Sequence, residues 1–318
     1  MNCFVRHSYV CLFAACVALA IGCDGGPHAT STGGPSAVYA GRGPIKVVCT
    51  TGMVADVVRA VGGPHVEVVQ LMGPGIDPHL YKASPGDVDA LIAADVIVYS
   101  GLHLEGKLAD LFAKMAARKP TIGLAEAIPA DRLLRVAESA VDPHVWFDVQ
   151  LWSTTVKPLA EALAKFDPPH ADDYRSGATK YTAELDALDT WCRARIQSLP
   201  QAARILVTAH DAFHYFGRAY GLEVRAIQGI STESEAGVRE INLLVDYLAE
   251  HKLKAVFIES SVSERNVRAL VEGAAARGHN VRIGGELYSD APGSAGTDAA
   301  SYIGMVRHNV DTMVGALE

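Results

Sequence analysis

The chain has 318 residues, of which 49% are hydrophobic and 20% charged, and its net charge is −8. This composition excludes the disordered class, and the length suits two medium-sized lobes better than one large core. The acidic balance argues against nucleic acid as a partner, because proteins that bind phosphate backbones carry clustered positive charge.

Residues 1–22 have the pattern of an export signal, with Arg6 and His7 ahead of an uncharged run from Val10 to Ile21. That run is shorter than the roughly 20 apolar residues that a membrane-spanning helix needs. It ends in Leu19-Ala20-Ile21-Gly22-Cys23, which resembles a bacterial lipobox. We therefore expect Cys23 to become the lipid-modified first residue of the mature protein, with plain secretion after nearby cleavage as the alternative.

Residues 23–43 are rich in Gly, Pro, Ser and Thr, which predicts a flexible tether to the membrane. Without the signal the chain carries 27 basic and 36 acidic residues, a net charge near −9. Beyond Cys23 it has two cysteines, Cys49 in an apolar strand and Cys192 on a helix. We expect both to be buried free thiols, and the sequence predicts no disulfide framework.

From Ile45 onward, short apolar runs alternate with helical patterns, which is typical of parallel sheets with crossover helices. The predicted strands of an N-terminal lobe, residues 44–171, are Ile45–Thr51, Val66–Met72, Val96–Gly101 and Pro120–Leu124. A helix over Met53–Val61 should stop at Gly62-Gly63. A second helix over Pro85–Ala94 should begin with a capping box at Ser84.

Residues 172–199 are predicted to form one long linking helix. Five of its side chains share a stripe at helical spacing: Tyr181, Leu185, Leu188, Cys192 and Ile196. No glycine or proline interrupts the segment between Gly177 and Pro200, whereas a flexible hinge would contain one. We therefore expect a rigid spine and small rather than large closing movements.

A C-terminal lobe, residues 200–318, repeats the pattern of the first. Its predicted strands are Ile205–Ala209, Glu223–Gln228, Ala255–Glu259 and Val281–Gly285, and its predicted helices are Val238–Glu250, Glu264–Arg277 and Ala299–Leu317. Ser263 and Thr297 are placed to cap the last two helices. The predicted fold class is α/β, with two Rossmann-like lobes joined by a single long backbone helix.

Histidine is the residue type that carries the candidate chemistry, because neutral imidazole is the commonest ligand for borderline metals. Among twelve histidines, His79 and His144 each end an Asp-Pro-His tripeptide, and the two tripeptides lie 65 residues apart. Proline fixes the backbone before each imidazole, and the aspartate can support a turn or bond the ring from behind. Most other histidines, including His103, lie in polar, loop or helix-edge contexts that predict solvated or capping roles.

His210 directly follows the predicted strand Ile205–Ala209. Ligands of open α/β sheets gather at the carboxyl ends of the strands, so this position favours a binding role. Asp290 lies beyond the last predicted strand of the C-terminal lobe and could supply a carboxylate.

The sequence resembles the cluster A-I (TroA-like) family of metal-specific solute-binding lipoproteins, which serve ABC importers for zinc and manganese. Matching segments from Ile45 to Leu317 are Asp77–Tyr81, Asp142–Trp146, Thr208–Phe213, Gly229–Thr232, Phe257–Ser261 and Gly284–Asp290. The resemblance implies four metal ligands, His79, His144, His210 and Asp290, two from each lobe. It also implies an extracytoplasmic monomer that delivers its cargo to a permease and its ATPase.

The cargo implied by the resemblance is Zn²⁺ or Mn²⁺. Three imidazoles and a carboxylate suit zinc, which also stands above manganese in the affinity series. Manganese-selective members of the family often have a glutamate at the position of His210, and many zinc-selective members carry a long His-rich loop. This chain has neither feature, since residues 102–119 contain only His103 and a few charges.

Two other functions compete with metal capture. His210 and His214 are spaced like the two zinc ligands of an HExxH metalloprotease, with Asp211 in place of the glutamate. An aspartate reaches less far as a general base, and His210 follows a strand, so the two imidazoles need not share a helical face. A surface adhesin with an incidental metal is the other alternative, and we expect no enzyme.

Overall fold

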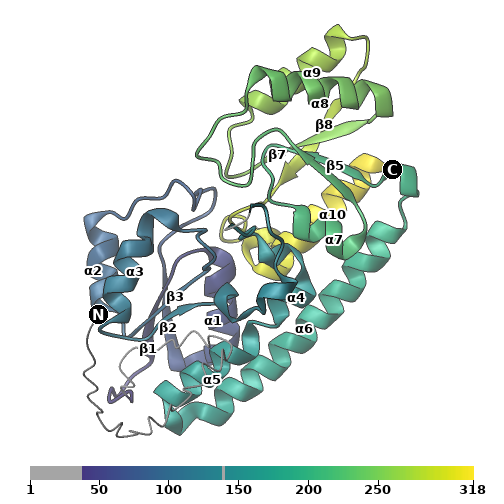
Figure 1. The fold of residues 1–318 in the computed structure, drawn as a ribbon. Coiled ribbons are helices and arrows are strands. Elements are labelled where there is room, and N and C mark those ends of the chain that lie inside the picture. Colours follow the sequence, from purple (N-terminus) through teal and green to yellow (C-terminus); the bar gives the residue numbers. More distant parts are fainter. Residues whose placement is uncertain (1–37, 138–139) are drawn as a thin grey trace, which may run out of the picture. The chain divides into compact units, whose positions relative to one another are not determined.

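The N-terminal lobe is built on a sheet of four parallel strands in the order β2-β1-β3-β4 (Figure 1). The computed structural model describes residues 38–137 and 140–318. The strands of this sheet are β1 (Ile45–Cys49), β2 (Val66–Gln70), β3 (Val96–Tyr99) and β4 (Thr121–Gly123). β1 is central: Val47 pairs with Val68 of β2 on one side and with Val96 of β3 on the other. The predicted parallel sheet is confirmed.

Helices α1 (Gly52–Gly62), α2 (Pro85–Ala93), α3 (Ala109–Ala116), α4 (Val149–Ser153) and α5 (Val156–Phe166) complete this lobe. Gly63 follows the last residue of α1 as its C-cap, and its positive φ of 51° is one that glycine adopts at little cost. α2 begins with the predicted capping box, in which Ser84 and Asp87 bond each other's main-chain N–H. Both predicted helix signals are confirmed, whereas α3, α4 and α5 were not predicted.

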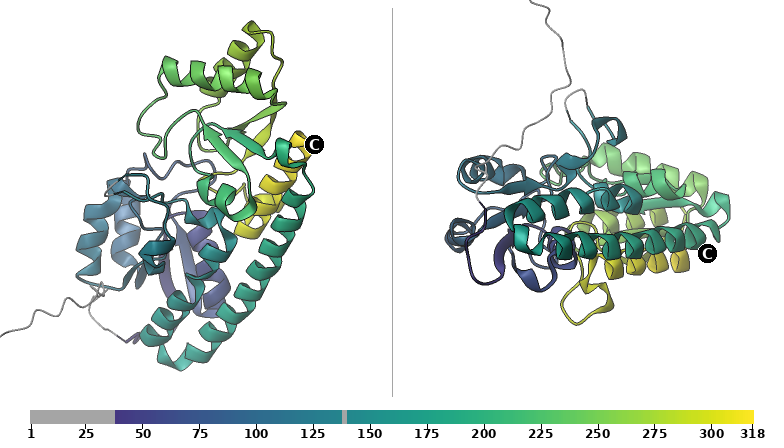
Figure 2. Two further views of the ribbon diagram at one scale, coloured as in Figure 1. Left: turned by 45° about the vertical axis from the view of Figure 1, so that its right-hand side comes forward. Right: turned by 90° about the horizontal axis from the view of Figure 1, so that it is seen from below.

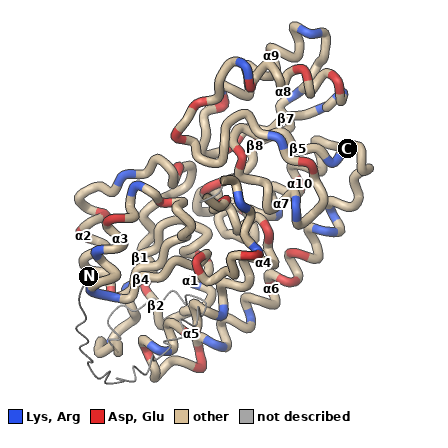
Figure 3. Tube along the Cα trace, viewed as in Figure 1, with Lys and Arg blue, Asp and Glu red and all other residues tan. Residues whose placement is uncertain are grey.

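α6 (Ala171–Gln197) is a single helix of 27 residues, as the sequence predicted. The five side chains of the predicted stripe are all buried. Three arginines of α6 pair with acidic side chains: Arg175 with Glu161 of α5, Arg193 with Asp189 of α6 itself, and Arg195 with Asp311. Figure 3 shows basic and acidic residues distributed along α6. α6 is therefore fixed by apolar contacts on one side and by ion pairs along its length.

The four predicted strands of the C-terminal lobe are present, and they pair as two small parallel sheets, β5-β6 and β7-β8. Its elements are β5 (Ile205–Thr208), α7 (His214–Tyr220), β6 (Glu223–Ala226), α8 (Val238–His251), β7 (Ala255–Glu259), α9 (Arg265–Ala276), β8 (Arg282–Leu287) and α10 (Tyr302–Leu317). β5 nevertheless lies beside β7. The carboxyl ends of β5 and β7 therefore meet on one side of the lobe.

The cap predicted for α9 is present, whereas the cap predicted for α10 is wrong. α9 begins at Arg265, whose main-chain N–H donates to the hydroxyl of Ser263 at 3.4 Å. α10 begins after Ser301, whose hydroxyl accepts a hydrogen bond from the N–H of Gly304. Thr297 instead precedes a short 3-10 turn, and its hydroxyl donates to the carbonyl of Ser294. The extended backbone of Ser301 separates that turn from the helix, so Ala299 lies outside α10.

The largest apolar core is shared by the two lobes. It includes Trp146 and Trp152 from the segment before α6, and Phe213 and Tyr302 from the segment after it. α10 packs against both α6 and α1, an arrangement that Figure 2 shows from two sides. A second core, which includes Val207, belongs to the C-terminal lobe alone. The shared core means that neither lobe is an independent packing unit.

The export signal, Cys23 and the tether up to residue 37 lie outside the described residues. Where the description begins, Tyr39 donates its main-chain N–H to the carbonyl of Phe166 at 2.6 Å, and the two rings pack together. Among the described helices, none combines the length and apolar character that crossing a bilayer requires. Cys49 and Cys192 are buried free thiols, as predicted.

Candidate metal centre

The structure brings His79, His144, His210 and Asp290 together from four separate segments. His79 lies in the turn between β2 and α2, and His144 immediately precedes a short 3-10 turn, Val145–Phe147. His210 follows β5 and Asp290 follows β8. All four side chains are buried, His79 being the most exposed at 6%. Two come from the part of the chain before α6 and two from the part after it.

The three imidazoles converge through the same ring atom. His144 Nε2 lies 3.2 Å from His79 Nε2 and 3.4 Å from His210 Nε2. The carboxylate of Asp290 places Oδ1 3.5 Å from His144 Nε2 and Oδ2 3.5 Å from His210 Nε2. Three nitrogens and a carboxylate therefore surround one small space.

These distances match the shell of a first-row transition metal. Zinc is held at about 2.0–2.1 Å by nitrogen and oxygen ligands, so the ligand atoms of a tetrahedral site lie about 3.3 Å from one another. Asp290 Oδ1 is buried and has no hydrogen-bond partner among the described residues, which leaves a negatively charged acceptor for a cation. The donor set, the spacing and the free acceptor all suit a divalent ion.

Two carboxylates orient the rings from behind. Asp142 Oδ1 is 2.7 Å from His144 Nδ1. Glu259, at the end of β7, bonds His210 Nδ1 and also accepts the main-chain N–H of His210 at 2.8 Å. A bond at Nδ1 selects the tautomer that presents Nε2 to a metal and makes the imidazole a stronger ligand. Both carboxylates are buried, at 0% and 3% exposure.

The two Asp-Pro-His tripeptides form the same local turn. Asp77 Oδ1 accepts the main-chain N–H of His79 at 2.8 Å, and Asp142 Oδ1 accepts that of His144 at 2.9 Å. Proline between the two residues removes a donor and restricts φ, which favours this aspartate-centred turn. The repeated tripeptide thus positions two imidazoles by one device, as the sequence led us to expect.

Asp290 is held by contacts that connect the part of the chain before α6 with the part after it. Ser261 donates to Asp290 Oδ2 at 2.9 Å and lies 2.8 Å from the hydroxyl of Ser289. The indole of Trp146 donates to the carbonyl of Ser289 at 3.0 Å, and the hydroxyl of Tyr302 donates to the carbonyl of Trp146 at 2.6 Å. These bonds hold the Asp290 segment against the segment that carries His144.

The ionisation of the metal-free site is uneven. Burial lowers the pKa of His79 to about 4. At His144 burial opposes the charged ring, but Asp142 and Asp290 outweigh it and raise the pKa to about 9. At His210 burial also opposes the charged ring, but Glu259 and Asp290 outweigh it and raise the pKa well above its usual value. The pKa of Asp290 stays well below its ordinary range because the two imidazoles outweigh its burial. Protons on His144 and His210 thus compete with a metal.

His214 does not join the four residues. It begins α7, while His210 lies in the preceding turn, so the two rings do not share a helical face. His214 Nε2 is 3.1 Å from Asp211 Oδ1, and Nδ1 is 3.9 Å from Asp142 Oδ2. The geometry of a metalloprotease HExxH helix is therefore absent from this segment.

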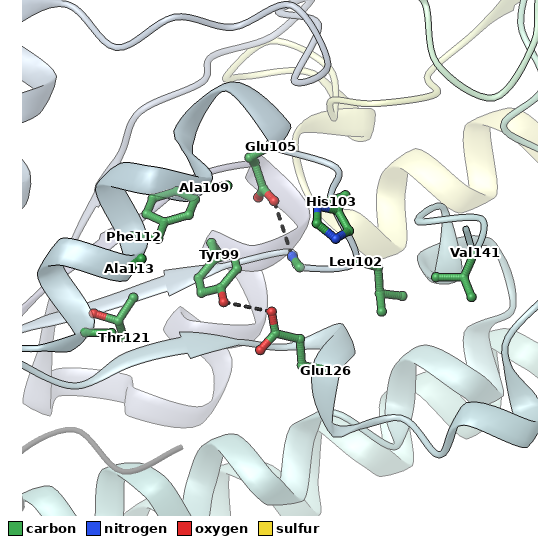
Figure 4. Close-up of a pocket in the computed structure, with 12 residues that line it drawn as sticks. Tyr99, Leu102, His103, Glu105, Ala109, Phe112, Ala113, Thr121, Glu126 and Val141 are labelled. Carbon is green, nitrogen blue, oxygen red and sulfur yellow. Dashed lines mark hydrogen bonds between the residues drawn. The ribbon is translucent and has the colours of Figure 1, made fainter. Parts of the chain in front are cut away.

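His103 lies in a separate cavity of about 500 Å³ (Figure 4). Tyr99 and Glu126 line it as well, and the hydroxyl of Tyr99 donates to Glu126 Oε1 at 2.7 Å. Glu105, also in the lining, accepts the N–H of Gly101 at 3.2 Å and supports the loop from within. His103 thus belongs to this pocket and is not one of the four clustered residues, in agreement with its loop context.

Known proteins are similar to this chain both in sequence and in fold. The family model ZnuA, described as zinc-uptake complex component A periplasmic, matches residues 47–316. The manganese-binding lipoprotein MntA of Bacillus subtilis (strain 168) is 49% identical over 290 residues, which cover 91% of this chain and 95% of that protein. The zinc-binding protein TroA of Treponema pallidum (strain Nichols) is 49% identical over 271 residues, 85% of this chain and 88% of that protein.

The solved structure of the periplasmic zinc-binding protein TroA from Treponema pallidum has the same fold, with a TM-score of 0.85 and 49% identity over 86% of this chain and 99% of that chain. The predicted two-lobed α/β fold and the resemblance inferred from the motifs are therefore confirmed. This chain belongs to the family of ZnuA, the periplasmic component A of zinc-uptake complexes.

Proposed function

We propose that this protein captures Zn²⁺ or Mn²⁺ outside the cytoplasm and delivers it to the permease of an ABC importer. His79, His144, His210 and Asp290 are the proposed ligands. The observation that carries the proposal is the convergence of three Nε2 atoms and one carboxylate within 3.2–3.5 Å of their neighbours. Membership of a metal-uptake family and relatives named for manganese and for zinc support the same cargo.

The donor set favours capture over catalysis. Three neutral imidazoles and one carboxylate give a charge of +1 around a divalent ion, and four protein ligands can complete a tetrahedral shell without water. A zinc hydrolase needs an open coordination position for water or substrate. The burial of all four side chains supports capture of the ion, and we propose no enzymatic activity.

The proposed location is the outer face of the membrane. Relatives of this chain are named as lipoproteins, and one group is named for manganese ABC transporters. We propose that a lipid on Cys23 anchors the protein, that residues 24–43 act as a tether, and that the protein works as a monomer beside its permease and ATPase. Mass spectrometry of the mature N-terminus tests the anchor, because plain secretion would leave an unmodified end.

Metal uptake in cells tests the function directly. Deletion of the gene should reduce accumulation of zinc or manganese at limiting concentration, and the wild-type gene should restore it. A variant with Asp290→Ala should not restore uptake, although it is exported and folded. Normal accumulation in the deletion strain would favour a scaffold role, and peptide cleavage lost on chelation would favour a hydrolase.

A further inference from the structure

The loop formed by residues 229–237, here called the crossing loop, runs from β6 to α8. Most of its side chains are exposed, and Thr232 is its one buried residue, at 9% exposure. A buried polar side chain within an exposed loop needs a partner, because an unpaired hydroxyl loses its water without compensation. The partner of Thr232 therefore shows what this loop is held against.

That partner is Asp77, which precedes α6 in the chain and belongs to the N-terminal lobe. The hydroxyl of Thr232 donates to Asp77 Oδ2 at 2.5 Å. The second oxygen, Oδ1, accepts the main-chain N–H of His79 at 2.8 Å. One carboxylate thus connects the crossing loop of the C-terminal lobe to the turn that carries a proposed metal ligand of the N-terminal lobe.

Other contacts support the same junction. The carboxylate of Glu233, next along the loop, pairs with Lys107 of the N-terminal lobe. At the start of the loop, the carbonyl of Gly229 lies 3.4 Å from the N–H of Asp211, the residue after His210. Where Gly75 approaches the C-terminal lobe, a Cβ atom would be 3.4 Å from the carbonyl of Ser260. The loop therefore lies between the His79 turn and the His210 segment.

His79 is held less directly than the other two histidines. Asp142 and Glu259 bond the rings of His144 and His210 at Nδ1. No carboxylate among the described residues pairs with the ring of His79, and the position of that ring depends on the Asp77 turn. His79 also has the greatest exposure of the four, at 6%. Loss of the metal should therefore begin at His79.

We infer that Thr232 and Asp77 are positioning residues that set how slowly the metal leaves. The hydrogen bond from Thr232 closes the crossing loop over the His79 turn, so opening of the site must first break it. This inference rests on the proposed function, since it concerns the residence time of the captured ion. Changes in such contacts act mainly on dissociation rates, and association is affected little.

Zinc dissociation from a Thr232→Val variant tests the inference. The soluble domain, residues 24–318, is loaded with one equivalent of Zn²⁺ and mixed with a chromophoric chelator at concentrations where the rate no longer depends on the chelator. Valine keeps the shape of threonine and removes the donor to a charged acceptor, so the dissociation rate constant should rise about tenfold. The association rate constant should change less than about twofold.

Three controls separate positioning from a structural role. Thr232→Ser keeps the hydroxyl and should dissociate at nearly the wild-type rate. The double variant Thr232→Val, Asp77→Ala should release zinc no faster than Asp77→Ala alone, because both changes remove the same hydrogen bond between Thr232 and Asp77. Glu233→Gln removes the exposed ion pair with Lys107 and should have a much smaller effect. The circular dichroism spectrum of metal-free Thr232→Val should match that of the wild type, which shows that the variant is folded.

The outcomes separate this inference from the function on which it rests. Wild-type zinc binding with unchanged dissociation in Thr232→Val overturns the inference alone. Equal acceleration by Thr232→Val and Thr232→Ser also overturns it, because the hydroxyl would then be irrelevant. A wild-type protein that binds no zinc overturns the proposed function together with this inference. Fast release in Thr232→Val, restored by serine and absent in the Asp77→Ala background, supports it.

Discussion

At the scale of single residues, two carboxylates orient the imidazoles of the proposed site from behind. Asp142 and Glu259 bond Nδ1 of His144 and His210, which leaves Nε2 of each ring facing the other proposed ligands, and both carboxylates are buried. The Asp-Pro-His tripeptide made Asp142 predictable, because the aspartate and the histidine are two residues apart. Glu259 was not predicted as a partner of His210, because 49 residues separate them and their contact depends on β5 lying beside β7.

Replacement of Glu259 by glutamine should weaken zinc affinity by about 10- to 100-fold, the usual cost of removing a carboxylate that orients a histidine ligand. The amide keeps the volume of the side chain but no longer stabilises the ring as a strong ligand. Competition against a chromophoric chelator measures the change. Glu264→Gln is the matched control, since Glu264 pairs with Arg268 at the surface. Equal affinities of the Glu259→Gln and wild-type proteins would contradict this role.

Metal affinity should fall as the pH is lowered from about 9. The pKa of His144 is raised to about 9 and that of His210 lies well above its usual value, so both rings bind protons in the metal-free state and must release them to bind a metal. Each displaced proton changes the apparent affinity about tenfold per pH unit below the pKa. His79, with a pKa near 4, adds no competition at neutral pH. Titrations at a series of pH values measure the slope, and a flat profile would contradict the protonation described here.

At the scale of elements, the contact between α1 and α6 depends on Gly177. A Cβ atom at this position would lie 2.6 Å from the carbonyl oxygen of Val61, a main-chain atom that cannot move aside easily. Gly177→Ala should therefore destabilise the protein by about 1–3 kcal/mol. Without this clash, alanine in a helix stabilises by about 1 kcal/mol relative to glycine. Chemical denaturation measures the change in the free energy of unfolding.

Gly315→Ala in α10 is the control for Gly177→Ala. No atom lies within 4 Å of the position that its Cβ would occupy, so this substitution should be neutral or stabilising. Opposite signs for the two variants would show that the α1–α6 contact decides the result. Equal effects on the free energy of unfolding would contradict the close approach at Gly177.

The sequence predicted the elements that have a long run of apolar residues at helical spacing or clear signals at their ends. The buried stripe of α6, the glycine that ends α1 and the capping box of α2 were all confirmed. α4 has only five residues, too few to show a period, and α5 contains Pro158 within its first turn. The division of the C-terminal strands into two sheets depends on pairing between distant segments, which a local pattern does not encode.

At the scale of the whole protein, the two lobes share one apolar core. Trp146 and Trp152 pack in the same cluster as Phe213 and Tyr302, although α6 separates the two pairs in sequence. Large rotation of one lobe against the other would expose these aromatic side chains to water at a cost of about 25 cal/mol per Å². Movements that leave this core closed, such as opening of the crossing loop, carry no such cost.

Small-angle scattering of the soluble domain, residues 24–318, should therefore show little change in the radius of gyration when zinc is added after chelation. The measurement compares metal-free and metal-loaded samples under identical ionic strength. A small change agrees with a rigid α6 and with local opening at the site. A large contraction on metal addition would contradict the shared core as a limit on movement.

Competitive titration of residues 24–318 tests whether His79, His144, His210 and Asp290 bind one divalent ion. After chelation, the wild-type protein and the variants His79→Ala and Asp290→Ala are titrated with zinc and with manganese in parallel. We expect tight one-to-one binding of at least one metal by the wild type. We also expect a loss of at least about 100-fold in affinity in each variant, whose circular dichroism spectra should remain native. Near-native affinity in either variant, or no stoichiometric binding by the wild type, would show that these residues do not form the metal site.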